Sequence, residues 1–306
     1  MSKIAFIYPG QGAQKAGMGA DFYENSEIAR YIFDQAGEEL DLDMKELCFE
    51  ENDRLDLTEY TQAAMVTTCL AMTRAVESMG LHADMTAGLS LGEYCAIAVA
   101  GGMCDLDAIR TVRSRGIFME HAAPEGSGAM SAVLGMDAAV IEDVLNGREG
   151  VSIANYNCPG QIVITGEADA VAEAGTVLKE AGARRVLPLK VSGPFHSPMM
   201  RPAGEELAKV FARVSMNPLK IPYVANINAE VITDCGRIEG LLVEQVSGSV
   251  RWQQSVETMI REGVDTFVEI GPGKTLTGFL RKIDKNVKAY HIGSWEEAVQ
   301  VCEELK

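Results

Sequence analysis

The segment Gly88-Leu89-Ser90-Leu91-Gly92 constrains the fold most, because a glycine stands two residues from the serine on each side. It follows a short strand-like stretch at 83–88 and leads into a helical pattern at 91–101. A strand, a sharp turn that carries serine and a helix together form the nucleophile elbow of α/β enzymes. Such a turn presents the Ser90 hydroxyl at a helix N-terminus, where backbone N–H groups stabilise an oxyanion. A serine that only caps the helix is the alternative interpretation of the same pattern.

The rest of the chain alternates between strand and helix patterns, which predicts an α/β protein. Between 127 and 193 the expected order is strand, helix, strand, strand, helix, strand, with strands at 127–135, 151–157, 161–166 and 184–193. Outside this region we expect strands at 3–8, 83–88, 222–226 and 266–270. We therefore expect a large α/β-hydrolase-like domain with a short parallel sheet (1–125 and 193–306) and a small ferredoxin-like insert domain (126–192).

The composition indicates a globular core and argues against nucleic acid as a partner. Of the 306 residues, 47% are hydrophobic, and the net charge of -17 opposes phosphate binding. No apolar stretch is long enough to span a bilayer, and the first residues resemble a strand rather than a secretion signal. We therefore expect a cytoplasmic protein with no membrane partner. Seven cysteines without a C-x-x-C pair and only four histidines favour reduced thiols and no metal site.

Two loops contain groups that would assist a serine nucleophile. His196 lies in a loop bounded by glycine and proline (192–198), where the insert rejoins the large domain, and it is our candidate for the general base. The other histidines lie in a turn (His82), at a helix end (His121) and in a terminal strand (His291). The backbone N–H of Gln11, in the glycine-rich loop after the first strand, is a candidate oxyanion donor.

Arg113 and Arg115 lie on the expected helix at 105–122. A guanidinium binds a carboxylate with two parallel hydrogen bonds, so one of the two arginines is a candidate to hold an acidic acyl group. From the residues alone the choice stays open, and a solvated arginine is the more frequent role of each.

Several longer motifs occur in one order along nearly the whole chain: PGQG, GLSLGEY, RSRG, GAMSAVLG, ANYNCPGQIVITG, SGPFHSPMM and EIGPGK. With these motifs the chain resembles the malonyl-CoA:acyl carrier protein transacylase family of bacterial fatty-acid synthesis. The resemblance implies that a malonyl group passes from malonyl-CoA to the phosphopantetheine thiol of acyl carrier protein, by ping-pong catalysis through a malonyl-serine ester. It also implies an enzyme that needs no cofactor and is usually a monomer.

The resemblance assigns a role to each matching residue. Ser90 resembles the acylated nucleophile, His196 its general base, and Arg115 the partner of the malonate carboxylate. The remaining assignments are the oxyanion hole (backbone N–H of Gln11 and Leu91), the backbone carbonyl that orients the histidine (Gln245) and the acyl pocket (Met119 and Phe195). Leu89 departs from the family, which commonly has histidine before the serine.

Alternatives remain at this stage. A serine hydrolase such as a thioesterase would share the elbow, and a non-catalytic binding module would keep the fold. Fatty-acid and polyketide pathways both use such a transacylase. The carrier protein is acidic in this family and needs a basic docking surface, for which there are two candidates: Lys179, Arg184, Arg185 and Lys190, or Lys274, Arg281, Lys282, Lys285 and Lys288.

Overall fold

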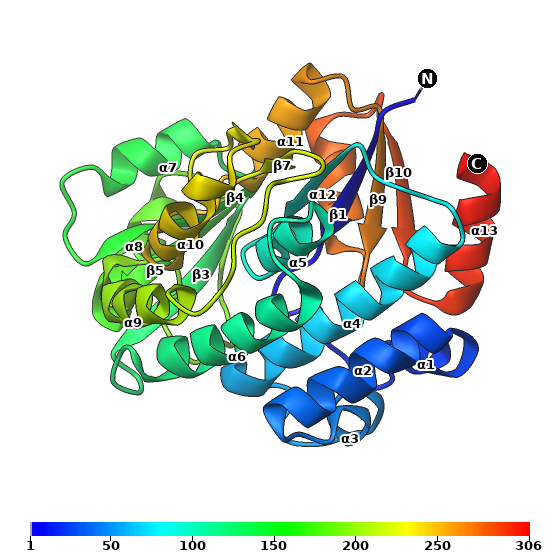
Figure 1. The fold of residues 1–306 in the computed structure, drawn as a ribbon. Helices are drawn as coiled ribbons and strands as arrows, with labels where there is room; N and C mark the ends of the chain where they lie inside the picture. Colours follow the sequence, from blue (N-terminus) through cyan, green and yellow to red (C-terminus); the bar gives the residue numbers. More distant parts are fainter. Residues whose placement is uncertain (1) are drawn as a thin grey trace.

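The computed structural model describes residues 2–306 and contains two β-sheets with helices packed against them (Figure 1). The larger sheet has the order β10 (Lys288–Ile292), β9 (Thr266–Ile270), β1 (Ile4–Tyr8), β2 (Met85–Gly88), β7 (Tyr223–Val224), β8 (Val231–Ile232). Its strand pairs are parallel except for β7 with β8. The smaller sheet has the order β4 (Val151–Cys158), β5 (Gln161–Glu167), β3 (Gly128–Leu134), β6 (Arg185–Pro188) and is antiparallel.

Helices cover both faces of the larger sheet. One face packs against α2 (Glu27–Leu40), α4 (Thr58–Ser78), α5 (Gly92–Val99), α6 (Asp105–His121), α9 (Arg201–Phe211) and α10 (Ile238–Ser247), and the other against α11 (Trp252–Arg261) and α12 (Thr275–Ile283). Phe6 and Tyr8 of β1 belong to the first core and Ala5 and Ile7 to the second. Because β1 is buried on both sides, its sequence is apolar without alternation, as in central parallel strands.

The remaining helices lie at the edges of these layers: α1 (Ala20–Asn25), α3 (Met44–Phe49), α13 (Trp295–Leu305), and α7 (Ala138–Leu145) and α8 (Ala168–Glu180) beside the smaller sheet. Short 3₁₀ turns are η1 (Pro198–Met200) and η2 (Cys235–Arg237). No helix within residues 2–306 has both the length and the apolar character needed to cross a membrane.

The smaller sheet is tied to the larger unit in a way that places one of its faces over the elbow. Its core with α7 and α8 contains Val133, Ile164 and Leu178. On β4, the Tyr156 N–H donates to Val250 O (2.9 Å) and the Val250 N–H donates to Ala154 O (2.7 Å). These bonds attach β4 to the segment after α10. The face of the smaller sheet opposite α7 and α8 lines a pocket.

The structure confirms the expected mixture of helices with one sheet of mainly parallel strands, and it contains a second, antiparallel sheet. The strand predicted at 184–193 is wrong beyond Pro188. Proline ends the regular pairing because it has no N–H, and after it only the Leu189 N–H continues, donating to Met130 O (2.9 Å). The strand predicted at 222–226 pairs over only Tyr223–Val224.

Candidate active site

Ser90 occupies a tight turn between β2 and α5. Its φ is 52°, in the left-handed region that a residue other than glycine adopts only when its surroundings impose it. A Cβ on Gly88 would overlap the backbone of Gly92, and a Cβ on Gly92 would overlap the Tyr8 carbonyl. Both glycines are therefore required by the close approach of strand and helix, which explains the G-x-S-x-G spacing.

Asn226, just after β7, holds this turn. Its Oδ1 accepts a hydrogen bond from the Ser90 N–H (2.6 Å), and its Nδ2 donates to Gly88 O (2.7 Å). The side chain is fully buried. The sequence analysis missed Asn226, since a single asparagine after a short strand carries no distinctive pattern.

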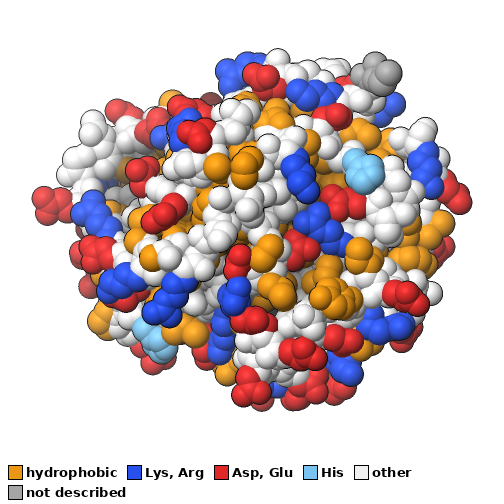
Figure 2. All heavy atoms as spheres, viewed as in Figure 1, with side chains coloured by type: hydrophobic (Ala, Val, Ile, Leu, Met, Phe, Trp, Pro, Cys, Tyr) orange, Lys and Arg blue, Asp and Glu red, His pale blue; other side chains and the backbone are white. Residues whose placement is uncertain are grey.

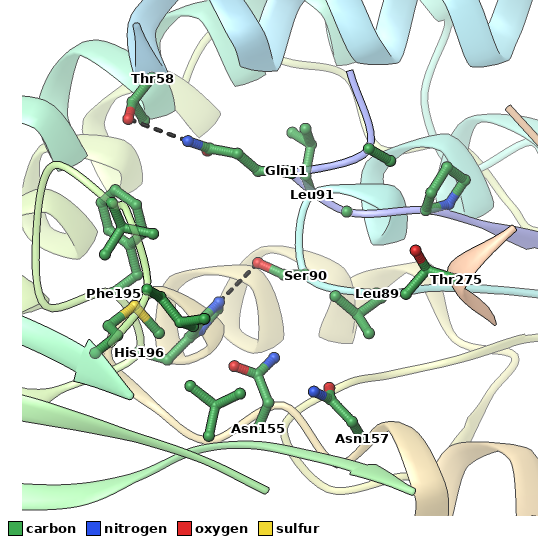
Figure 3. Close-up of a pocket in the computed structure, with 18 of the residues that line it drawn as sticks. Gln11, Thr58, Leu89, Ser90, Leu91, Asn155, Asn157, Phe195, His196 and Thr275 are labelled. Atoms are coloured by element: carbon green, nitrogen blue, oxygen red, sulfur yellow. Dashed lines mark hydrogen bonds between the residues drawn. The ribbon is translucent and has the colours of Figure 1, made fainter. Parts of the chain in front are cut away.

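Ser90 and His196 are in direct contact, as Figure 3 shows, with Ser90 Oγ 2.7 Å from His196 Nε2. The other ring nitrogen, Nδ1, lies 2.9 Å from Gln245 O and 3.2 Å from Gly248 O. Both of those oxygens only accept, so Nδ1 carries the proton and Nε2 is free to accept the serine proton. The structure thus brings together the predicted nucleophile, base and orienting carbonyl.

The surroundings keep the imidazole uncharged at neutral pH. Burial, and to a smaller extent the nearby positive charge of Arg115, lower the pKa of His196 to about 4. The hydrogen bonds to Gln245 and Gly248 act against this shift without cancelling it. A neutral imidazole is the form that accepts a proton, as a general base must.

Two backbone N–H groups belong to residues that line the pocket beside Ser90. Leu91 directly precedes α5, and Gln11 follows β1, the strand next to β2. Both residues line the pocket, and within residues 2–306 neither N–H has a hydrogen-bond acceptor. Figure 3 shows them around Ser90, with the Gln11 side chain turned away to donate to Thr58 Oγ1 (3.2 Å). These are the two groups that the sequence analysis assigned to an oxyanion hole.

The structure separates the two candidate arginines. Arg113 forms an ion pair with Glu59 (3.1 Å) and lies over the Tyr60 ring (4.4 Å). Arg115 is 1% exposed, and its Nη2 lies 3.2 Å from Ser90 Oγ. Burial lowers the pKa of Arg115 from its usual value, although a guanidinium remains protonated.

Arg115 is held by two glutamine side chains. Its Nη1 donates to Gln62 Oε1 (2.8 Å) and its Nη2 to Gln245 Oε1 (3.0 Å). Gln245 Nε2 in turn donates to Ser90 O (2.9 Å) and to Glu93 Oε2 (2.7 Å). Gln245 therefore contacts the base through its backbone and the arginine through its side chain.

Gln62 and Glu93 were not predicted as site residues. Gln62 is a fully buried amide on α4, in a stretch of alanine, methionine, valine and threonine, and that lone amide was the available signal. Burial raises the pKa of Glu93 to about 8, and its hydrogen bonds with Gln245 and Asn226 oppose that shift.

A pocket of about 800 Å³ opens above Ser90. Arg115, Met119, Phe195 and His196 line it from the larger unit. The smaller sheet supplies Met130, Ala132, Asn155, Asn157 and Val163, and Figure 3 shows the two asparagine amides beneath Ser90 and Leu89. Met119 and Phe195 are nearly buried and contribute apolar side chains to the pocket. Leu89 lines the pocket too and packs against the second core.

No cluster of three or more His, Cys, Asp or Glu side chains in the described chain, 2–306, is arranged to hold a metal ion. The groups around Ser90 are instead an imidazole, a guanidinium, amides and free N–H donors. Chemically, such a set suits transfer of an acyl group through a serine ester.

Comparisons with known proteins also indicate acyl transfer. Malonyl CoA-acyl carrier protein transacylase of Bacillus subtilis is 44% identical over 311 residues, covering 100% of this chain and 98% of that protein. The crystal structure of malonyl CoA-acyl carrier protein transacylase from Clostridium perfringens superposes with a TM-score of 0.96 at 40% identity, covering 99% of this chain and 97% of that chain. A chain in the structure of a type II PKS acyl-carrier protein in complex with its malonyl-transacylase superposes with a TM-score of 0.94 at 36% identity, covering 99% of this chain and 100% of that chain. The family model described as the acyl transferase domain matches residues 5–300, and the chain therefore belongs to the acyl transferase family.

Proposed function

We propose that this protein transfers the malonyl group of malonyl-CoA to the phosphopantetheine thiol of acyl carrier protein, through a malonyl ester of Ser90. The position of Arg115 carries the proposal: a buried guanidinium lies 3.2 Å from the nucleophile and has amide oxygens as its side-chain partners on the other sides. An acyl group on Ser90 that ends in a carboxylate would supply the anion there. The names of the relatives support the same substrate and acceptor.

In the first half-reaction Ser90 Oγ attacks the thioester carbonyl while His196 Nε2 takes the hydroxyl proton. The oxyanion accepts hydrogen bonds from the N–H groups of Gln11 and Leu91. The intermediate then collapses, the bond to sulfur breaks, and the imidazolium returns its proton to the leaving CoA thiolate. Malonyl-Ser90 remains, with its free carboxylate on Arg115.

In the second half-reaction His196 takes the proton of the carrier thiol, and the thiolate attacks the ester carbonyl. The same N–H pair stabilises the oxyanion, and the proton passes back to Ser90 Oγ as the ester breaks. Phe195 limits the space beside the α-carbon, so a methylmalonyl group is disfavoured. An acetyl group leaves Arg115 unpaired in the pocket, which disfavours acetyl transfer.

The carrier protein must bring its thiol to the pocket mouth, where Lys190 is a lining residue. We place the acidic carrier on the first basic cluster, which comprises the end of α8 (Lys179), the start of β6 and the residue before it (Arg184 and Arg185), and the segment after β6 (Lys190). In the second cluster Lys274 is already paired with Glu297 (3.0 Å). Figure 2 shows acidic side chains gathered at the lower edge, where α2 and α3 lie, so this part of the surface would repel the carrier.

Finer aspects of the architecture and setting belong to the proposal as well. Residues 126–192 form a ferredoxin-like insert domain, in line with the element order β3-α7-β4-β5-α8-β6, and residues 1–125 and 193–306 form an α/β-hydrolase-like domain. The enzyme supplies malonyl units for fatty-acid synthesis in the cytoplasm, as a monomer without a cofactor.

Intact-protein mass after incubation with malonyl-CoA tests the proposal. We expect the wild type to gain one malonyl group and Ser90→Ala to gain none. Absence of an adduct on the wild type would favour a non-catalytic module. Adding holo acyl carrier protein separates transfer from hydrolysis: rapid release of malonate without loading of the carrier would make the protein a thioesterase.

A further inference from the structure

We propose that Gln62 is a positioning residue that sets acyl specificity: with Gln245 it holds Arg115 through neutral oxygens, so that the positive charge stays available to a carboxylate on the acyl group. The inference rests on the proposed function, in which Arg115 binds that carboxylate. It adds a role for the Gln62 side chain, which acts through its hydrogen bond with Arg115.

The hydrogen bonds fix which end of each amide faces Arg115. A guanidinium only donates, so both glutamines must present oxygen to it. Gln245 Nε2 is taken by Ser90 O (2.9 Å) and Glu93 Oε2 (2.7 Å), which leaves Gln245 Oε1 for Arg115. Gln62 Nε2 lies 3.5 Å from Gln11 Oε1 and 3.6 Å from Met119 Sδ, both acceptors, so Gln62 Oε1 also faces the guanidinium.

The contacts show which nitrogen of Arg115 faces the acyl group. Nη1 donates to Gln62 Oε1, and Nε is buried without an acceptor in the described part of the chain. Nη2 lies 3.2 Å from Ser90 Oγ, the atom that carries the acyl group in the proposed mechanism. A carboxylate at the end of that acyl group would therefore lie near Nη2 and accept a charge-assisted hydrogen bond from it.

Stability alone would favour a carboxylate at position 62. Arginines elsewhere on α4 and α6 take that solution: Arg74 pairs with Glu77 and Asp105 (each 2.7 Å), and Arg113 pairs with Glu59 (3.1 Å). Glutamate has nearly the same shape as glutamine, and breaking or omitting the partner of a buried charge is strongly unfavourable. A neutral amide beside a buried cation is therefore better explained by function than by folding.

The nearest carboxyl group does not change this balance. Glu93 hydrogen-bonds Gln245 and forms no ion pair with Arg115 in the described part of the chain. Burial raises the pKa of Glu93 to about 8, although the positive charge of Arg115 acts against this shift. At pH 7 its carboxyl is therefore mostly protonated, and the positive charge of Arg115 has no full counter-charge in the resting site.

The test is Gln62→Glu, which adds a carboxylate next to Arg115 at nearly unchanged volume, with Gln62→Leu as the matched variant that removes the hydrogen bond without adding charge. The measured quantity is the ratio of kcat/KM for malonyl-CoA to kcat/KM for acetyl-CoA. We expect Gln62→Glu to lower this ratio by about 10- to 100-fold, the size of a lost hydrogen bond between charged groups. For Gln62→Leu we expect a raised KM for malonyl-CoA, with kcat changed less than about threefold, because Arg115 keeps its charge and loses a positioning contact.

Arg115→Ala and the double variant Arg115→Ala/Gln62→Glu complete a double-mutant cycle. If the introduced carboxylate acts through Arg115, adding Gln62→Glu to Arg115→Ala lowers the ratio by less than about threefold. An equal fall in both backgrounds, or a Gln62→Glu ratio within about threefold of the wild type, overturns the inference. An Arg115→Ala ratio equal to the wild type refutes instead the proposed role of Arg115. If Gln62→Glu does not fold, Gln62→Leu decides: an unchanged KM for malonyl-CoA overturns the inference.

Discussion

The environment of His196 predicts a specific loss of stability at mildly acidic pH. Burial and the charge of Arg115 lower the native pKa of His196 to about 4, whereas a histidine in the unfolded chain titrates near 6.5. The unfolded chain therefore binds this proton first as the pH falls. The contribution of His196 to the free energy of unfolding is constant above about pH 7 and decreases as the pH falls from there to about 4.

The size of the effect follows from the two pKa values. Protonation of His196 is about 3 kcal/mol less favourable in the native state, and about 2 kcal/mol of this difference is expressed at pH 5. His196→Asn removes the titration, and asparagine tolerates the left-handed φ of 61° at this position. Relative to pH 7, the wild type should therefore lose about 2 kcal/mol more than the variant at pH 5.

Urea unfolding at pH 7, 6 and 5 measures this difference. The other titrating groups are common to both proteins, so they cancel in the comparison. A difference between wild type and His196→Asn that stays constant from pH 7 to pH 5 would refute the reasoning. It would mean that the imidazole charges as easily in the folded protein as in the unfolded chain, and that the site is not desolvated.

Further predictions concern the interaction between Arg115 and His196 and the turn that carries Ser90. For Arg115→Met, the acidic limb of the pH–rate profile for Ser90 acylation by acetyl-CoA should move to higher pH, because the cation that lowers the pKa of His196 is gone. Rapid-mixing kinetics across the acidic range measure this limb, and an unmoved limb contradicts the prediction. Asn226→Ala leaves the Ser90 N–H and Gly88 carbonyl without their partner, and urea unfolding should show a loss of about 2–4 kcal/mol. The free energy of unfolding of Gly92→Ala should fall by about 2 kcal/mol or more, because its Cβ overlaps the Tyr8 carbonyl, whereas that of Gly240→Ala on α10, where a Cβ has open space, should rise by up to about 1 kcal/mol. Equal stabilities of these two variants would show that the elbow tolerates a side chain.

The sequence predicts the features of the fold that depend on local patterns. The elbow follows from glycine spacing between a strand and a helix, and β3 to β6 follow from alternating strand and helix stretches. The helices α1 and α3 have six residues each and are too short to show a helical period. α9 was also missed, although its buried Ala203, Leu207 and Phe211 recur at a helical spacing of four.

The parts of the site that were missed depend on partners far away in the chain. Asn226 reaches Ser90 across 136 positions, and Gln62 reaches Arg115 across 53. Nothing near position 226 indicates that its amide will close a turn formed by β2 and α5. The choice between Arg113 and Arg115 likewise needs the packing of α6 on α4, where Gly116 allows the close approach that places Arg115 beside Gln62.

The site uses neutral oxygens at positions where many hydrolases use a carboxylate. The imidazole of His196 is oriented by the carbonyls of Gln245 and Gly248. A carboxylate in their place would raise the pKa of His196 and would also lie near Arg115, offsetting part of its charge. Under the proposed function, both changes would work against an anionic acyl group: the charge that selects malonate would be weaker, and a negative group would stand beside the ester. Carbonyl and amide partners orient the base and the arginine while leaving the cation of Arg115 for the substrate to neutralise.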